Sequence, residues 1–123
     1  MQPIGVLISG YQREDARAIK AFLDKQLDSY VLMVSASPAS ERKLVEILRD
    51  GGEDYYQEEE TKILMFLGFS EVQTHMVLEA FPTGGSLARP IFCTLTSQNQ
   101  QFPFRDLVAH LIEEHRHWKG KDA

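Results

Sequence analysis

The chain has 123 residues, 43% of them hydrophobic and 25% charged, and its formal net charge is −5. These values are typical of a globular domain with its own core and exclude an extensively disordered chain. Residues 51–61, here called the acidic strap, carry five carboxylates and no Lys or Arg. Nucleic-acid binding requires clustered cations, so DNA and RNA are not expected partners. We predict one domain, with a first half at about 4–50 and a second half at about 62–118.

The sequence predicts a cytoplasmic protein without a membrane partner. No apolar run approaches the roughly 20 residues that a membrane span requires. The first residues, Met1 to Gly5, lack the charged start and long apolar stretch of a signal peptide. The single cysteine, Cys93, lies within an apolar run, which indicates a buried, slowly reacting thiol in a reducing compartment.

The first half begins with an apolar run at residues 4–8, which has the length of a buried strand and is followed by Gly10. Apolar residues then recur at helical spacing between Ala16 and Leu23, which predicts an amphipathic helix of about three turns. A second apolar run at residues 30–34 predicts the next strand.

The second helix of this half is expected to begin at Ser37-Pro38, where a capping side chain precedes a proline. Its apolar face would be formed by residues 44–48. Gly51-Gly52 is expected to end it, because glycine adopts the left-handed conformation of a helix C-terminus at little cost.

After the strap the pattern starts again, with a strand predicted at residues 63–67. Ser70 and Gln73 form a capping-box pattern at the start of a helix. Pro82, followed by Gly84-Gly85, is expected to stop this helix.

The last two elements are a strand at residues 90–95 and a helix that we expect to reach about Trp118. The turn between them is Thr96-Ser97-Gln98-Asn99. The helix presents one apolar stripe to the sheet, composed of Phe104, Leu107, Val108, Leu111 and Ile112.

The two halves repeat one order of elements, including the turns Gly10-Tyr11 and Gly68-Phe69. We therefore predict an α/β fold of duplicated βαβα halves, with a four-stranded sheet covered by helices. Continuous apolar strands indicate that both faces of the sheet are covered. Two arrangements remain open: a twofold axis normal to the sheet makes the central strands antiparallel, whereas a translation makes the sheet fully parallel.

The sequence contains no pattern of a catalytic, cofactor or metal site. Gly10 and Gly68 occupy the place where phosphate sites lie in α/β sheets, but neither nucleotide-binding fingerprint occurs. His110, Glu114 and His117 lie on one helix face but spread over about 10 Å at 1.5 Å per residue, too far for one ion. We predict no enzyme and no cofactor.

Four residues are candidates for partner binding. Tyr55 and Tyr56 are adjacent aromatic residues in a charged segment, where they either tuck onto the domain or stay exposed as anchors. His115 and Trp118 lie at the end of the last helix, beyond the residues that face the sheet. Aromatic anchors are common in protein interfaces, so we predict a dimer or partner interface there.

The second half resembles a widespread bacterial family known only as a domain of unknown function. The resemblance rests on residues 63–69, on the motif Thr96-x-x-Asn99, and on an amphipathic helix ending in Glu113-Glu114-His115. It covers roughly the last 60 residues, and the family implies no activity or catalytic residues. The layout of four strands, helices and an acidic middle also looks like the small assembly chaperone of cyanobacterial carboxysomes, which binds a shell-protein tail.

Together these features predict a non-enzymatic interaction or assembly factor, a homodimer that binds a segment of a partner protein, with a shell-protein tail as one such partner. The alternative is a small-molecule-binding or enzymatic domain that uses the turns at Gly10 and Gly68. A ligand domain would place converging polar groups in a pocket at the strand ends, whereas an adaptor would present an apolar patch or groove.

Overall fold

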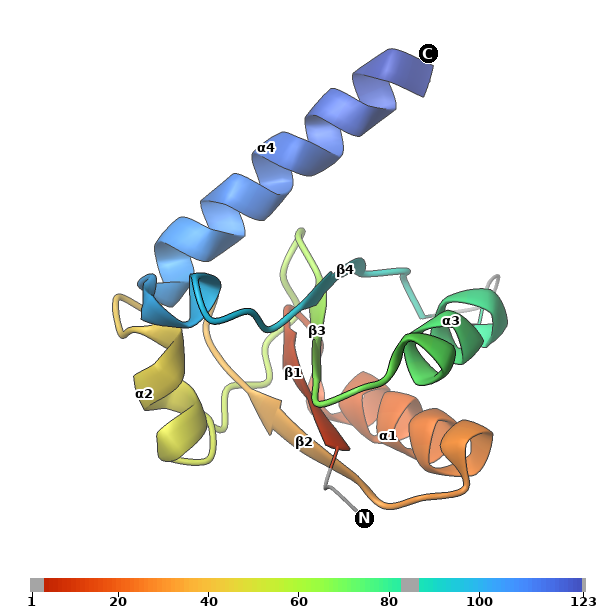
Figure 1. Cartoon of the computed structure of the whole chain (residues 1–123). Helices are drawn as coiled ribbons and strands as arrows, with labels where there is room; N and C mark the ends of the chain where they lie inside the picture. The colour runs from red at the N-terminus through yellow and green to blue at the C-terminus, as the bar shows by residue number, and fades with distance from the viewer. Residues whose placement is uncertain (1–3, 83–86, 123) are drawn as a thin grey trace.

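The computed structural model describes residues 4–82 and 87–122, with the side chains of the last helix described as far as Arg116. The chain forms an α/β fold, as predicted (Figure 1). No helix in this part of the chain is both long enough and apolar enough to cross a bilayer. The elements in chain order are β1 (Ile4–Ser9), α1 (Arg13–Leu27), β2 (Val31–Ser35), α2 (Leu44–Arg49), β3 (Ile63–Leu67), α3 (Glu71–Ala80), β4 (Ile91–Thr94), the short 3-10 helix η1 (Asn99–Gln101) and α4 (Phe104–Asp122).

The four strands form one sheet in the order β2-β1-β3-β4, to which each half contributes two neighbouring strands. Within each half the strands are parallel, whereas the central strands β1 and β3 are antiparallel. This arrangement confirms the duplicated halves. It also selects the twofold relation between them and excludes the fully parallel sheet.

The twofold relation is visible in the register of the central strands. Leu7 and Met65 stand at the same distance before Gly10 and Gly68, so they are equivalent positions of the two halves. They pair directly with each other across β1 and β3. The local twofold axis therefore passes through this pair.

The starts of α2 and α4 meet in the same symmetric way. The N–H of Leu44 donates to the carbonyl of Phe102 at 3.0 Å, and the N–H of Phe104 donates to the carbonyl of Arg42 at 2.8 Å. Each helix thus satisfies one of its free N-terminal donors with the backbone that precedes the other helix.

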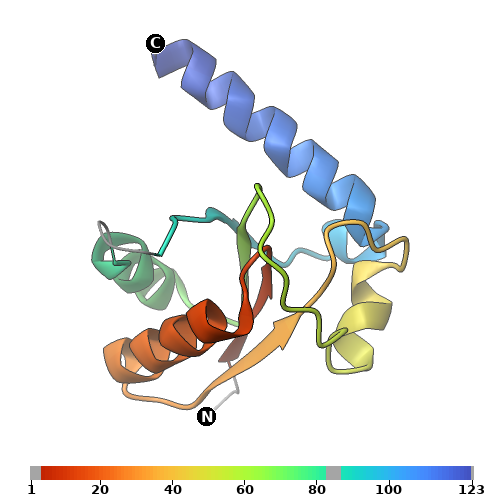
Figure 2. The same cartoon turned by 180° about the vertical axis from the view of Figure 1, so that it is seen from behind.

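Helices cover both faces of the sheet, α1 and α3 on one side and α2 with the start of α4 on the other (Figure 1 and Figure 2). Side chains alternate along each strand, so Ile8 and Phe66 enter the first core while Leu7 and Met65 enter the second. Two buried faces explain why the central strands read as continuous apolar runs.

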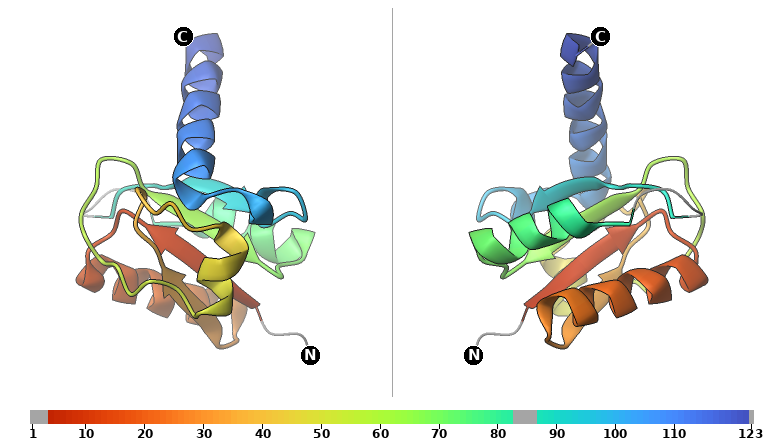
Figure 3. Two further views of the ribbon diagram at one scale, coloured as in Figure 1. Left: turned by 90° about the vertical axis from the view of Figure 1, so that its left-hand side faces the viewer. Right: turned by 90° about the vertical axis from the view of Figure 1, so that its right-hand side faces the viewer.

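Helix α4 begins against the sheet and then leaves it. Its predicted stripe is buried as far as Leu111, Ile112 is half-buried, and residues 113–116 are exposed. The rest of the helix stands out past β4 at the edge of the sheet (Figure 3). It continues to Asp122, beyond the predicted end near Trp118.

The predicted helix start at Ser37-Pro38 is wrong, because α2 begins only at Leu44. The carboxylate of Glu53 accepts hydrogen bonds from the N–H of Ser37 at 3.0 Å and from the hydroxyl of Ser40 at 2.8 Å. These contacts come from the acidic strap and hold residues 36–43 as a loop, so a tertiary contact overrides the local capping signal.

Other local signals are confirmed. Ser70 and Gln73 form both hydrogen bonds of a capping box at the start of α3. Gly51 and Gly52 have positive φ angles of 80° and 93° directly after α2. Gly10 and Gly68 also have positive φ angles, 93° and 77°, and occupy equivalent turns after β1 and β3.

Candidate functional site

The four predicted partner-binding residues do not form one site. Tyr56 lines a groove between α1 and β2, whereas His115 lines pockets beside β4. Tyr55 is a half-buried residue of the strap, and His115 is an exposed residue of α4. The side chain of Trp118 lies outside the described residues, so its role in an interface stays a prediction.

Tyr55 fixes the strap to the sheet, which corresponds to the tucked alternative. Its N–H donates to the hydroxyl of Ser35 at 2.8 Å, and its own hydroxyl donates to the carboxylate of Glu59 at 2.6 Å. The hydrogen bond to Glu59 raises the pKa of Tyr55, because it stabilises the protonated phenol. Tyr55 is therefore tucked onto the domain, and its part in partner binding stays a prediction.

The strap also closes the first glycine turn. The N–H of Glu59 donates to the carbonyl of Gly10 at 3.1 Å, and a Cβ placed on Gly10 would lie 2.2 Å from the carbonyl oxygen of Thr61. The equivalent Gly68 is exposed. At that second turn the capping box already engages the N–H groups of Ser70 and Gln73. The two turns therefore differ: contacts with the strap surround Gly10, whereas the capping box engages two backbone donors after Gly68.

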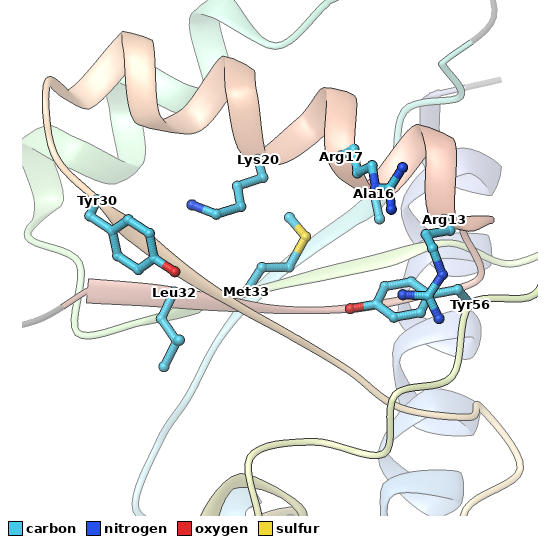
Figure 4. Close-up of a pocket in the computed structure, with 8 residues that line it drawn as sticks. All are labelled: Arg13, Ala16, Arg17, Lys20, Tyr30, Leu32, Met33 and Tyr56. Atoms are coloured by element: carbon cyan, nitrogen blue, oxygen red, sulfur yellow. The ribbon is translucent and has the colours of Figure 1, made fainter.

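A groove between α1 and the outer strand β2, here called the α1–β2 groove, has a volume of about 210 Å³ (Figure 4). One wall carries cations from α1, the floor is apolar, and a tyrosine stands at each end. The lining residues are Arg13, Ala16, Arg17, Lys20, Tyr30, Leu32, Met33 and Tyr56.

Helical spacing brings the cations together, because Arg13, Arg17 and Lys20 follow one another at i, i+4 and i+7. The guanidinium of Arg13 lies 4.3 Å from the ring centroid of Tyr56, and the ammonium of Lys20 lies 3.8 Å from that of Tyr30. These cation–π contacts orient both side chains along the groove.

The three cations differ in how far their charge is already neutralised. Lys20 pairs with Asp24 at 2.8 Å, and Arg13 lies 3.5 Å from a carboxylate oxygen of Asp54. Arg17 is exposed and has no carboxylate partner within the described part of the chain. Arg17 is therefore the cation most available to an external anionic group.

Apolar surface continues from the groove into solvent. Tyr30 is 73% exposed and Leu32 is 53% exposed, two of the largest exposures among the described hydrophobic side chains. Leu32 points to the face that α2 covers farther along the sheet, but α2 is short and does not reach it. The outer strand therefore carries exposed apolar side chains, with Tyr30 beside Lys20 and Leu32 pointing away from the cations (Figure 4).

Sequence reasoning found Tyr56 but missed the rest of this groove. The spacing of Arg13, Arg17 and Lys20 on a predicted helix was the available signal. The exposure of Tyr30 and Leu32 was not readable, because an apolar run of five residues gives no sign of which side chains remain uncovered.

A second groove, here called the β4–α4 groove, runs between the other outer strand and the departing helix. Pockets of about 330, 380 and 430 Å³ follow one another along it. From β4 and its flanks they are lined by Arg89, Pro90, Ile91, Phe92 and Cys93, and from α4 by Leu107, His110, Leu111, Ile112, Glu114, His115 and Arg116.

Cys93 is half-buried in this groove and not fully buried as expected. Burial raises the pKa of its thiol to about 12, and the nearby Glu114 adds to the shift. Because thiolate is the reactive form, slow labelling at neutral pH stays the prediction.

The motif Thr96-x-x-Asn99 has a structural role at the end of β4. The N–H of Thr96 donates to the side-chain oxygen of Asn99 at 2.8 Å, and the N–H of Asn99 donates to the Thr96 hydroxyl at 2.9 Å. The Asn99 amide also donates to the carbonyl of Thr94 at 3.0 Å. The motif therefore caps η1 and occupies one backbone acceptor at the edge of the sheet.

The histidines of α4 lie along the groove as separate groups. His110 lies 3.1 Å from Glu114 in an exposed i, i+4 pair, and the side chain of His117 lies outside the described residues. Residues 4–82 and 87–116 contain no group of three or more side chains arranged to hold a metal ion.

Residues 62–117 match a family described as "Domain of unknown function (DUF3783)". The second half of the chain thus carries that domain, in agreement with the resemblance seen in its sequence. No curated protein and no solved structure matches the chain. The resemblance to the carboxysome assembly chaperone has no support from these comparisons.

Proposed function

We propose that this protein is a non-enzymatic interaction module, an assembly factor that binds an acidic segment of a partner protein in the α1–β2 groove. The observation that supports the proposal is the row of three cations on α1, together with the exposed side chains of Tyr30, which contacts Lys20, and of Leu32 at the outer strand. Arginine and tyrosine are the residues most enriched at the energetic centres of protein interfaces.

The shape of the groove favours a protein segment over a small molecule. Its volume of about 210 Å³ is below the range of roughly 300–1,000 Å³ that is usual for small-molecule pockets. Tyr30 and Leu32 extend the contact surface beyond the pocket, so an elongated chain covers more of it than a compact ligand does.

Charge favours an acidic segment and disfavours a nucleic acid. A carboxylate can form a bidentate pair with Arg17, and its neighbours can contact the cations at either side. A polyphosphate chain would meet Asp54 and the rest of the acidic strap next to Tyr56. Three cations with an acidic neighbour give little of the counterion release on which nucleic-acid binding depends.

Site-specific photo-crosslinking in the native cell tests this proposal. A photoreactive amino acid at Leu32 is expected to capture a discrete partner protein, and Arg17→Glu in the same chain is expected to abolish the adduct. Val72 on α3 is a matched control, because it is 69% exposed and lies away from the groove. Equal adducts from both positions, or none from Leu32, would contradict the proposal.

A homodimer through the end of α4 is a second part of the proposal, with His115 and Trp118 as its anchors. It is supported by the course of α4, which leaves its own sheet after Leu111 (Figure 3). Trp118→Ala is expected to weaken association by about 1–3 kcal/mol, measured by sedimentation. A cytoplasmic location is proposed with it, since the single cysteine fits a reducing compartment.

A further inference from the structure

On the outer edge of β4 some backbone N–H and C=O groups have no hydrogen-bond partner. The pattern of these free groups indicates what kind of segment can pair with the strand. In a parallel ladder the N–H and C=O of one residue face the same neighbour, and residues alternate between the two sides. The N–H of Ile91 donates to Lys62 at 2.8 Å, and the N–H of Leu95 donates to Phe66 at 3.1 Å, so these residues face β3.

Pro90, Phe92 and Thr94 therefore face outward, away from the sheet. Pro90 has no N–H, and the Thr94 carbonyl already accepts from Asn99. Four outward groups remain: the carbonyl of Pro90, both groups of Phe92, and the N–H of Thr94. No contact from the described residues engages any of them. A single added strand would satisfy all four.

Helix α4 limits what can be added there. It leaves the sheet after Leu111 and extends outward beyond β4, on the face of the sheet that α2 covers (Figure 1 and Figure 3). The pockets between α4 and β4 run the length of the strand, from Arg89 to Thr96. A single extended chain fits between the strand and the helix, whereas a second folded sheet would meet α4.

The side chains of the added segment that face α4 would contact apolar residues of the groove. Ile91 and Cys93 are both half-buried on that face, and Leu111 contributes from the helix. Because side chains alternate along a strand, the added segment would place every second side chain against them. The groove thus selects apolar residues at alternate positions.

Charge sets the direction of the added segment. The pocket at the Pro90 end is lined by Arg89, His115 and Arg116, together with Lys62, which already pairs with Glu58 at 2.9 Å. Two carboxylates lie there as well: Glu60 lines this pocket and Glu114 lines the adjoining one, against the four cationic or basic side chains. A terminal carboxylate would be stabilised at this end and a terminal ammonium would be repelled. The added strand would therefore run antiparallel to β4.

We infer that the β4–α4 groove binds the extended carboxyl-terminal tail of a partner protein by strand addition, with its terminal carboxylate between Arg89 and Arg116. Strand addition derives its affinity from backbone hydrogen bonds and its specificity from alternate side-chain contacts. This groove is separate from the α1–β2 groove, so the two binding proposals can fail independently, whereas His115 belongs both to this groove and to the proposed dimer interface.

Selection of displayed peptides that bind the full-length protein tests the inference. Randomised octapeptides with a free carboxyl terminus are the probe, and the same library fused at its carboxyl end is the control. We expect enrichment only from the free-terminus library, with apolar residues at alternate positions. Amidation of the carboxyl terminus is expected to weaken a selected peptide at least tenfold, as measured by fluorescence anisotropy.

Two variants locate the site. Thr94→Pro removes the outward N–H from an exposed edge position, where proline is tolerated, and is expected to weaken binding at least tenfold, whereas Thr94→Ala keeps the donor and the affinity. Arg116→Glu, on the exposed face of α4, provides a second test that does not depend on the strand. The inference is overturned if the two libraries enrich equally, or if neither Thr94→Pro nor Arg116→Glu weakens a selected peptide. Loss of binding only in Arg17→Glu would assign the peptide to the α1–β2 groove and would also overturn it.

Discussion

The two outer strands of the sheet are equivalent by the duplication, yet the chain treats their edges differently. On β2, Val31 is enclosed by an ion pair of α1: its N–H donates to Asp24 at 2.8 Å, and its carbonyl accepts from Lys20 at 3.1 Å. At the other end, the carbonyl of Ser35 accepts from the N–H of Glu53 at 2.6 Å. On β4, only the carbonyl of Thr94 has a comparable partner.

The difference teaches how one architecture can engage more backbone groups on one outer edge of the sheet than on the other. Unpaired strand edges promote association, so proteins usually cover them or blunt them. Here α1 and the acidic strap engage the two ends of the β2 edge, while no contact from the described residues engages the backbone groups of Met33 between them. Within residues 62–82 and 87–122 no segment engages the β4 edge as the strap engages Ser35, and Pro90 and Asn99 blunt this edge only at its ends. Duplication reproduced the elements, and the segments between them determined which edge stayed accessible.

Substitutions in the turns after the central strands are expected to give the largest difference between the halves in the free energy of unfolding. Gly10→Ala combines a positive φ with a contact to the strap backbone and is expected to destabilise the protein by about 3 kcal/mol. Gly68→Ala, in the exposed equivalent turn, carries the conformational cost alone, about 1 kcal/mol. Chemical denaturation of both variants measures this difference. Equal losses of stability would show that contact with the strap backbone adds nothing to the cost of a side chain at Gly10.

The strap itself depends on Glu53, whose side chain is 17% exposed and accepts hydrogen bonds from the loop before α2. Glu53→Ala is expected to cost about 2 kcal/mol, because two donors lose a charged acceptor. Glu60→Ala, an exposed position on the same segment, is the control and should stay within about 0.5 kcal/mol. Similar melting temperatures for the two variants would mean that the strap adds little to the first half.

The ion pair that engages Val31 at the β2 edge gives the smallest expected effect on stability. Burial alone would raise the pKa of Asp24, but the hydrogen bonds from Lys20 and from the N–H of Val31 lower it overall. Asp24→Ala is expected to cost about 0.5–1 kcal/mol near neutral pH, since the pair is partly exposed.

The pH dependence has a defined sign. A lowered folded-state pKa stabilises the protein above the unfolded value of about 4, and this contribution is lost as the pH falls through the folded value. The difference in the free energy of unfolding between the wild type and Asp24→Ala should therefore narrow in acid, as measured by chemical denaturation at several pH values. A difference in stability that widens in acid would contradict the assignment of the lowered pKa to the hydrogen bonds of Asp24.

Much of the fold was readable in the sequence, because periodicity and turn chemistry are local properties. The apolar runs, the box at Ser70 and Gln73, and the glycines at 10 and 68 each specified an element or its end without help from distant residues. The duplication followed from their repeated order. Tyr56 was identified as a candidate for the same reason, since an aromatic residue in a charged segment is conspicuous by itself.

The other features of the fold were decided only by the tertiary structure, because they depend on contacts between residues that are distant in the sequence. Whether Ser37 begins a helix was decided by a carboxylate from the strap, and the relation between the halves was decided by the antiparallel pairing of Leu7 with Met65. The openness of β4 likewise depends on the proline before it, on Asn99 after it, and on the direction in which α4 leaves the sheet. A linear pattern records which residues are apolar or charged, whereas an uncovered edge exists only once every other segment has taken its place.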